Sequence, residues 1–87
     1  IKNKLGLHAR AANMVVQVAS KFESTVIVEK DGIAANAKSI MGLLLLAAGQ
    51  GSQIILKAQG RDAKAAITAI GKLIEDSFGE KEHAVHQ

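Results

Sequence analysis

The fold is decided by Ser24-Thr-Val-Ile-Val-Glu-Lys30, the dipeptide Asp31-Gly32 and Ile33-Ala-Ala-Asn-Ala37, which follow one another directly along the chain. The first run is rich in β-branched residues, which favour strands. An Asp-Gly loop joins antiparallel strands, because its backbone twist matches theirs. We therefore predict a β-hairpin over residues 24–37 and, with it, an antiparallel sheet.

Helices and further strands are predicted on both sides of this hairpin. One helix runs from about Ala9 to Ser20 or Lys21 and another from about Arg61 to Phe78, because apolar residues recur there at steps of three and four. A short apolar helix is predicted over Ile40–Ala48, with glycines behind it. Short strands are expected at Ile1–Leu5, before the first helix, and at Ser52–Gln59.

The resulting order is βαββαβα, which indicates an α+β fold: an open-faced sandwich with a four-stranded antiparallel sheet covered on one face by three helices. With 87 residues the chain is expected to form one domain. We place this domain at residues 1–79 and a polar tail at residues 80–87.

Composition excludes several function classes. The chain has no cysteine, which excludes disulfides, thiolate chemistry and cysteine-based metal sites. No apolar run approaches the ~20 residues of a membrane span, so we expect a cytoplasmic protein without membrane insertion. The net charge of +3 permits an acidic partner, but two Phe and no Tyr or Trp offer almost nothing on which nucleic-acid bases could stack. An acidic protein surface is favoured, and a small RNA-binding domain is the disfavoured rival.

The stretch Leu5-Gly-Leu-His-Ala-Arg-Ala-Ala12 is the candidate chemical site, because it places His8 at the predicted start of the first helix. Free N–H groups and the positive end of the helix dipole can hold a phosphate there. Arg10 can add a charge-assisted hydrogen bond to the same oxygens. The alternatives are a structural histidine at the helix start and a solvated surface arginine.

Ser39 precedes the short apolar helix and has two interpretations. It is a suitable N-cap residue, and it is also a candidate phosphorylation site whose added charge would lie beside an apolar surface. The run Leu43–Leu46 is too long to bury on one stripe, which indicates an exposed docking surface. His83 and His86 form a weak metal motif, and we predict neither a metal site nor a cofactor.

Two motifs together, Gly6-Leu-His-Ala-Arg10 and Asn36-Ala-Lys-Ser-Ile-Met-Gly42, resemble the signatures of the histidine-containing phosphocarrier family HPr of the phosphoenolpyruvate-dependent phosphotransferase system. The resemblance covers almost the whole chain. It implies a carrier, not an enzyme, that takes a phosphoryl group from enzyme I and passes it to an EIIA component. It also implies the following residue roles: phosphoryl acceptor His8, phosphate contact Arg10, target of an HPr kinase/phosphorylase Ser39, and partner contacts Ile40, Met41 and Leu44.

Some questions stay open at the level of sequence. Position 11 is Ala where the family usually has Pro, and the predicted first strand is short. The residues around His8 are similar both to sugar-branch proteins and to the nitrogen-branch paralogue NPr. A regulator that binds transporters, kinases or transcription factors according to phosphorylation of Ser39 is a further alternative. We expect a monomer, because a carrier presents one face to successive partners.

Overall fold

The structure is a computed structural model, and it describes residues 1, 6–46 and 48–79. Its elements follow one another in the order α1 (Ala9–Ala19), β1 (Thr25–Lys30), β2 (Ile33–Asn36), α2 (Ile40–Leu45), β3 (Ile55–Gln59), α3 (Ala63–Glu75) and the 3₁₀ turn η1 (Ser77–Gly79).

The sheet contains three described strands in the order β2-β1-β3, and both pairs are antiparallel. The predicted hairpin is confirmed: Lys30 pairs with Ile33 across a two-residue turn in which Asp31 and Gly32 have φ values of 52° and 81°. Positive φ at both positions is what a type I′ turn requires. The predicted fourth strand falls mainly on residues 2–5, which lie outside the described residues.

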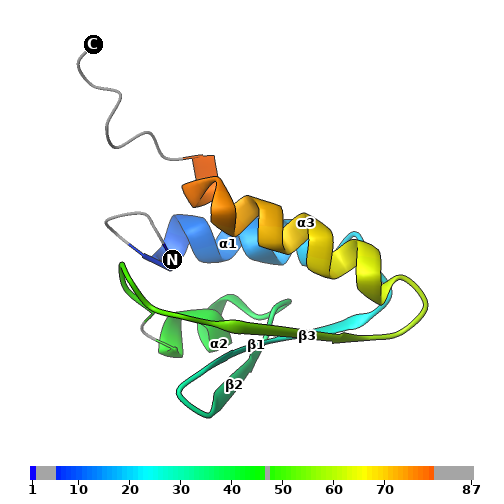
Figure 1. The fold of residues 1–87 in the computed structure, drawn as a ribbon, viewed down its shortest axis with the longest axis horizontal. Helices are drawn as coiled ribbons and strands as arrows, with labels where there is room; N and C mark the ends of the chain where they lie inside the picture. Colours follow the sequence, from blue (N-terminus) through cyan, green and yellow to red (C-terminus); the bar gives the residue numbers. More distant parts are fainter. Residues whose placement is uncertain (2–5, 47, 80–87) are drawn as a thin grey trace.

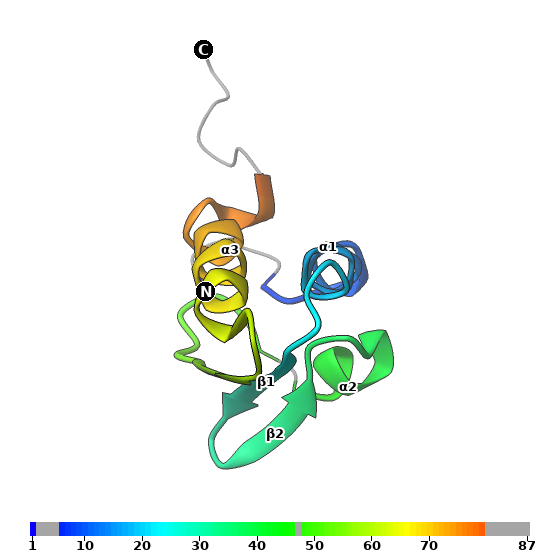
Figure 2. The same cartoon turned by 90° about the vertical axis from the view of Figure 1, so that its right-hand side faces the viewer.

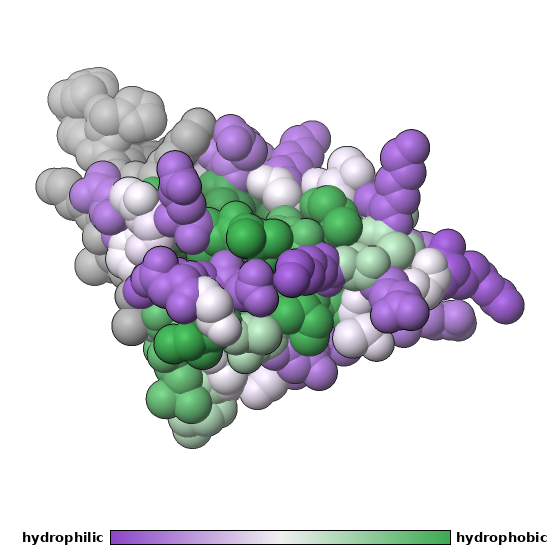
Figure 3. All heavy atoms as spheres, turned by 60° about the horizontal axis from the view of Figure 1, so that its bottom comes forward, coloured by the Kyte–Doolittle hydropathy of each residue, from purple (hydrophilic) through white to green (hydrophobic). Residues whose placement is uncertain are grey.

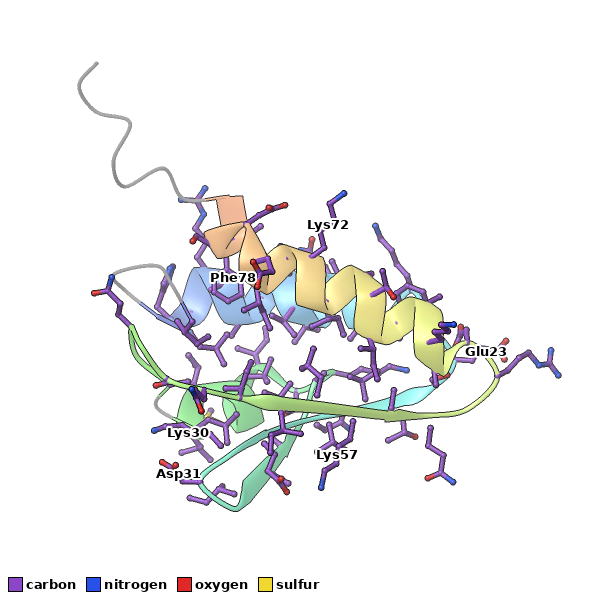
Figure 4. All side chains as sticks on the ribbon, in the orientation of Figure 1. Glu23, Lys30, Asp31, Lys57, Lys72 and Phe78 are labelled. Atoms are coloured by element: carbon purple, nitrogen blue, oxygen red, sulfur yellow. The ribbon has the colours of Figure 1, made fainter. Side chains whose placement is uncertain are left out.

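Figure 1 shows α1 and α3 above β3, and the end-on view in Figure 2 shows that α2 lies on the same side of the twisted sheet. Val26 and Val28 of β1 are buried beneath them, whereas Thr25 is exposed on the opposite side. On that open side Lys57 points away from the helices and pairs with Glu29 at 3.4 Å (Figure 4). The layer arrangement predicted from the hydrophobic pattern is therefore confirmed for the described strands.

The core lies between helices and sheet. Its largest fully buried side chains come from all three helices and from the central strand: Leu43, Ile70, Val15, Val26 and Val28. The third helix was predicted to continue to Phe78, and this is wrong. Ser77 and Phe78 have φ values of 53° and 57°, so the chain leaves the helix after Glu75 and buries Phe78 instead (Figure 4).

Two further predicted boundaries are wrong. The short helix ends at Leu45, not at Ala48, because the chain turns there and buries Leu46 and Ala48 against the core. The last strand begins at Ile55 and not at Ser52. The residues that precede it form a loop, in which the amide of Gly51 donates to the carbonyl of Ile1 at 2.8 Å.

Candidate functional site

His8 is the N-cap of α1, as predicted. Its backbone is extended, with φ −83° and ψ 179°, and its carbonyl accepts the first intrahelical hydrogen bond, from the amide of Ala12 at 2.8 Å. The half-buried imidazole makes no capping hydrogen bond to the helix. The His8 side chain therefore does not cap the helix, although capping is the usual structural role of a side chain at this position.

The first turn of α1 offers positive charge to an anion. The amides of Ala9, Arg10 and Ala11 follow the N-cap and have no acceptor within the helix. Ala9 and Arg10 are exposed, and no acidic residue stands in the turn to neutralise the helix dipole. Arg10 lies two positions after His8 on the same exposed turn, so the sequence-predicted pair occupies one end of one helix.

The segment before His8 rests on the loop between α2 and β3. The amide of Leu7 donates to the carbonyl of Ala48 at 2.8 Å, and the amide of His8 donates to the carbonyl of Gly6 at 3.0 Å. Gly6, Leu7 and Ala48 are all buried. Sequence reasoning missed Ala48, whose signal was weak: it ends an apolar run and precedes Gly49.

Ser39 is the N-cap of α2, as its capping interpretation predicts. Its backbone is extended, and its hydroxyl accepts a hydrogen bond from the amide of Gly42 at 3.1 Å. The segment before it is held by Lys38, whose ammonium donates to the carbonyl of Phe22 at 2.8 Å. Ser39 is half-buried, so the start of α2 is only partly open to solvent.

The helix that follows carries an apolar surface. We call its exposed residues the α2 surface: Ile40, Met41, Leu44 and Leu45. Leu43 and Leu46 are buried, which confirms that the leucine run divides between core and solvent. Leu45, 74% exposed, was not singled out in the sequence, because a run of four leucines does not show which one faces outward. Figure 3 shows apolar surface among polar side chains at the end of the molecule where α2 and the hairpin lie.

A groove elsewhere on the molecule does not include the candidate site. A shallow groove of about 600 Å³ runs along the outer side of α3, from which Lys72 points away from the molecule (Figure 4), and its lining includes none of the predicted site residues. Among residues 1, 6–46 and 48–79, no three acidic or histidine side chains are grouped as a metal site would require. His83 and His86 lie outside the described residues.

A family model described as "PTS HPr component phosphorylation site" matches residues 1–76. The chain belongs to the HPr family. It is 51% identical to the phosphocarrier protein HPr of Neisseria meningitidis serogroup B, over 94% of this chain and 92% of that protein. It is 44% identical to the phosphocarrier protein NPr of Shewanella violacea, over 92% of this chain and 88% of that protein.

The fold agrees with this assignment. The crystal structure of HPr-C-His from Thermoanaerobacter tengcongensis superposes with a TM-score of 0.89 at 54% identity, covering 93% of this chain and 91% of that one. The chain is therefore a phosphocarrier of the phosphotransferase system, a carrier and not an enzyme, and its partners belong to that system. No helix in the described part of the chain is long and apolar enough to cross a membrane.

Proposed function

We propose that His8 is the residue that carries the phosphoryl group. A ring nitrogen of its imidazole attacks the phosphorus held by phosphorylated enzyme I; the new P–N bond forms as the bond to the donor residue breaks. In a second exchange of the same kind, an acceptor residue of an EIIA component attacks this phosphorus, and the P–N bond to His8 breaks as the new bond forms. The observation that supports this most directly is the placement of the His8 imidazole at the N-cap of α1, beside the exposed first turn of that helix.

The first turn of α1 and Arg10 stabilise the phosphoryl oxygens in this proposal. Phosphoryl transfer depends mainly on positioning and on neutralising charge. The amides of the first turn and the exposed guanidinium supply both without a metal ion or a cofactor. Because Arg10 is exposed and His8 is only half-buried, a partner can both deliver and remove the group.

The α2 surface is proposed as the docking face, with Ile40, Met41 and Leu44 as predicted and Leu45 added. Ser39 at the start of the same helix is proposed as the site modified by an HPr kinase/phosphorylase. A phosphate there would add about −1.5 to −2 charges beside this surface and repel an acidic partner. The helix itself would tolerate the phosphate, because its dipole favours negative charge at the N-terminus.

A second question is whether the chain serves the sugar branch or the nitrogen branch of the phosphotransferase system. The 44% identity to an NPr protein keeps nitrogen-branch duty as an alternative to sugar uptake. Parallel transfer assays with the EIIA components of the two branches separate them, because the true acceptor takes the phosphoryl group faster. We further propose a cytoplasmic monomer with its carrier domain at residues 1–79 and a polar tail at residues 80–87.

The test compares substitutions at two of the three histidines of the chain. Wild-type protein, His8→Ala and the control His86→Ala are incubated with phosphoenolpyruvate and enzyme I, and EIIA is then added. We expect phosphate uptake and onward transfer by the wild-type protein and the control, and neither step by His8→Ala. Uptake by a correctly folded His8→Ala protein would exclude His8 as the acceptor. Binding of a regulator that depends on Ser39 and survives His8→Ala would favour the regulatory alternative.

A further inference from the structure

Gly6 lies where two segments of backbone come unusually close together. It is buried and has a φ of +64°. A Cβ atom at this position would lie 2.6 Å from the Cα atom of Gly49 and closer still to the carbonyl oxygen of Ala48. Both obstacles are backbone atoms, which cannot swing aside as the end of a side chain can. Only glycine lets the segment before His8 lie directly on Ala48 and Gly49.

This contact is connected to His8 by backbone hydrogen bonds on both sides. Leu7 donates to the carbonyl of Ala48 at 2.8 Å, and His8 donates to the carbonyl of Gly6 at 3.0 Å. On the other side, the carbonyl of His8 accepts from Ala12 of α1. The backbone of His8 is thus held between α1 and the junction formed by Gly6, Leu7, Ala48 and Gly49.

We infer that Gly6 is a positioning residue for phosphoryl transfer, acting through its contact with Ala48 and Gly49. This inference rests on the proposed role of His8. A methyl group at position 6 would push the segment that carries His8 off the loop, and the imidazole would shift relative to the first turn of α1. Misplacing a reacting group by about 1 Å lowers rates by roughly 10²-fold. The α2 surface is not altered, so docking is retained while transfer is slowed.

The test compares Gly6→Ala with Gly51→Ala. Gly51 also has a positive φ, +88°, but a Cβ atom there would meet nothing within 4 Å. Both variants place alanine at a positive φ, which strains the backbone in each, and only Gly6→Ala adds the clash. The measurement is kcat and KM for phosphoryl transfer from phosphorylated enzyme I, at a temperature where both variants are folded.

We expect Gly6→Ala to lower kcat at least about tenfold while KM stays within about twofold, and Gly51→Ala to retain the wild-type kcat. A wild-type kcat in Gly6→Ala would overturn the inference. An equal loss in both variants would also overturn it, because strain in the loop region and not the contact would then be responsible. Failure of the wild-type protein to accept phosphate would instead refute the proposed function.

A second variant covers the case in which Gly6→Ala does not fold. Replacing the Leu7 residue by its α-hydroxy acid turns the amide into an ester and removes the hydrogen-bond donor to Ala48 without adding a side-chain atom. The junction is then weakened and not blocked. A lowered kcat with unchanged KM supports the inference, and wild-type kinetics in a folded ester protein contradict it.

Discussion

At the scale of single residues, Asp62 joins the start of α3 to the start of β1. Its carboxylate accepts hydrogen bonds from the amides of Glu23 and Ser24, at 3.0 and 2.9 Å, and from the hydroxyl of Ser24. These bonds favour the charged form. The hydroxyl of Ser24, followed by the amide of Glu23, lowers the pKa of Asp62 below its ordinary value of 3.8.

The sign of this shift gives a pH prediction for Asp62→Asn. Because the folded pKa is lowered, the stabilisation is present above the unfolded pKa and is lost as the pH falls through the folded value. We expect Asp62→Asn to have a lower urea midpoint than wild type at about pH 7, and the difference to shrink between about pH 5 and pH 2. The control is Asp76→Asn, because Asp76 is an exposed residue at the C-cap of α3. A difference between wild type and Asp62→Asn that does not vary with pH would contradict this account.

Ser39 gives a second prediction at this scale. Its hydroxyl caps α2, so Ser39→Ala should lower the free energy of unfolding by about 1 kcal/mol. Ser39→Asp should keep most of that stability, because aspartate also caps helices well. Urea denaturation measures both variants. Equal stability of Ser39→Ala and wild type would show that this cap contributes nothing.

At the scale of secondary-structure elements, α3 contains a glycine that its packing does not require. A Cβ atom at Gly71 would meet nothing within 4 Å, whereas one at Gly42 in α2 would lie 3.3 Å from the hydroxyl oxygen of Ser39. We expect Gly71→Ala to raise the free energy of unfolding by about 0.5–1 kcal/mol, because alanine loses less backbone entropy in a helix. Gly42→Ala should raise the free energy of unfolding less, because its methyl group would crowd the Ser39 hydroxyl. A Gly71→Ala protein no more stable than wild type would contradict this expectation.

The elements also show what sequence patterns can and cannot predict. Periodicity and the Asp-Gly turn predicted α1 and the hairpin, because local residues determine both. The predicted end of α3 was wrong. Ser77 and Phe78 adopt left-handed conformations that bury Phe78 in the core, and the core residues around it are far away in sequence. At the candidate site, the motif indicated His8 and Arg10, but the contact of Gly6 with Ala48 is a tertiary approach that the local sequence does not show.

At the scale of the whole molecule, the start of α1 and the α2 surface lie at the same end, where α1 and α2 pack together (Figure 1). A partner that docks on the α2 surface is therefore brought to the end of the molecule where His8 lies. Ile55 offers a comparison, because it is also an exposed apolar residue, at 55%, but lies on the open face of the sheet.

This arrangement predicts that a negative charge added on the α2 surface weakens docking, whereas the same charge on the open face of the sheet does not. Leu45→Glu should raise KM for phosphorylated enzyme I about tenfold, equivalent to about 1.4 kcal/mol of docking energy, with little change in kcat. Ile55→Glu should leave both constants near wild type. Steady-state transfer kinetics of the two variants decide the matter. Similar KM values for the two variants would mean that the α2 surface does not dock this partner.

The central claim, that His8 carries the phosphoryl group, is tested most directly by locating the phosphate in the chain. After incubation with phosphoenolpyruvate and enzyme I, trypsin digestion at neutral pH and mass spectrometry separate the candidates, because cleavage after lysine and arginine places them in different peptides: His8 in residues 5–10, Ser39 in 39–57, and His83 with His86 in 82–87. We predict one acid-labile phosphoryl group on residues 5–10. Phosphate confined to either of the other peptides would contradict the account.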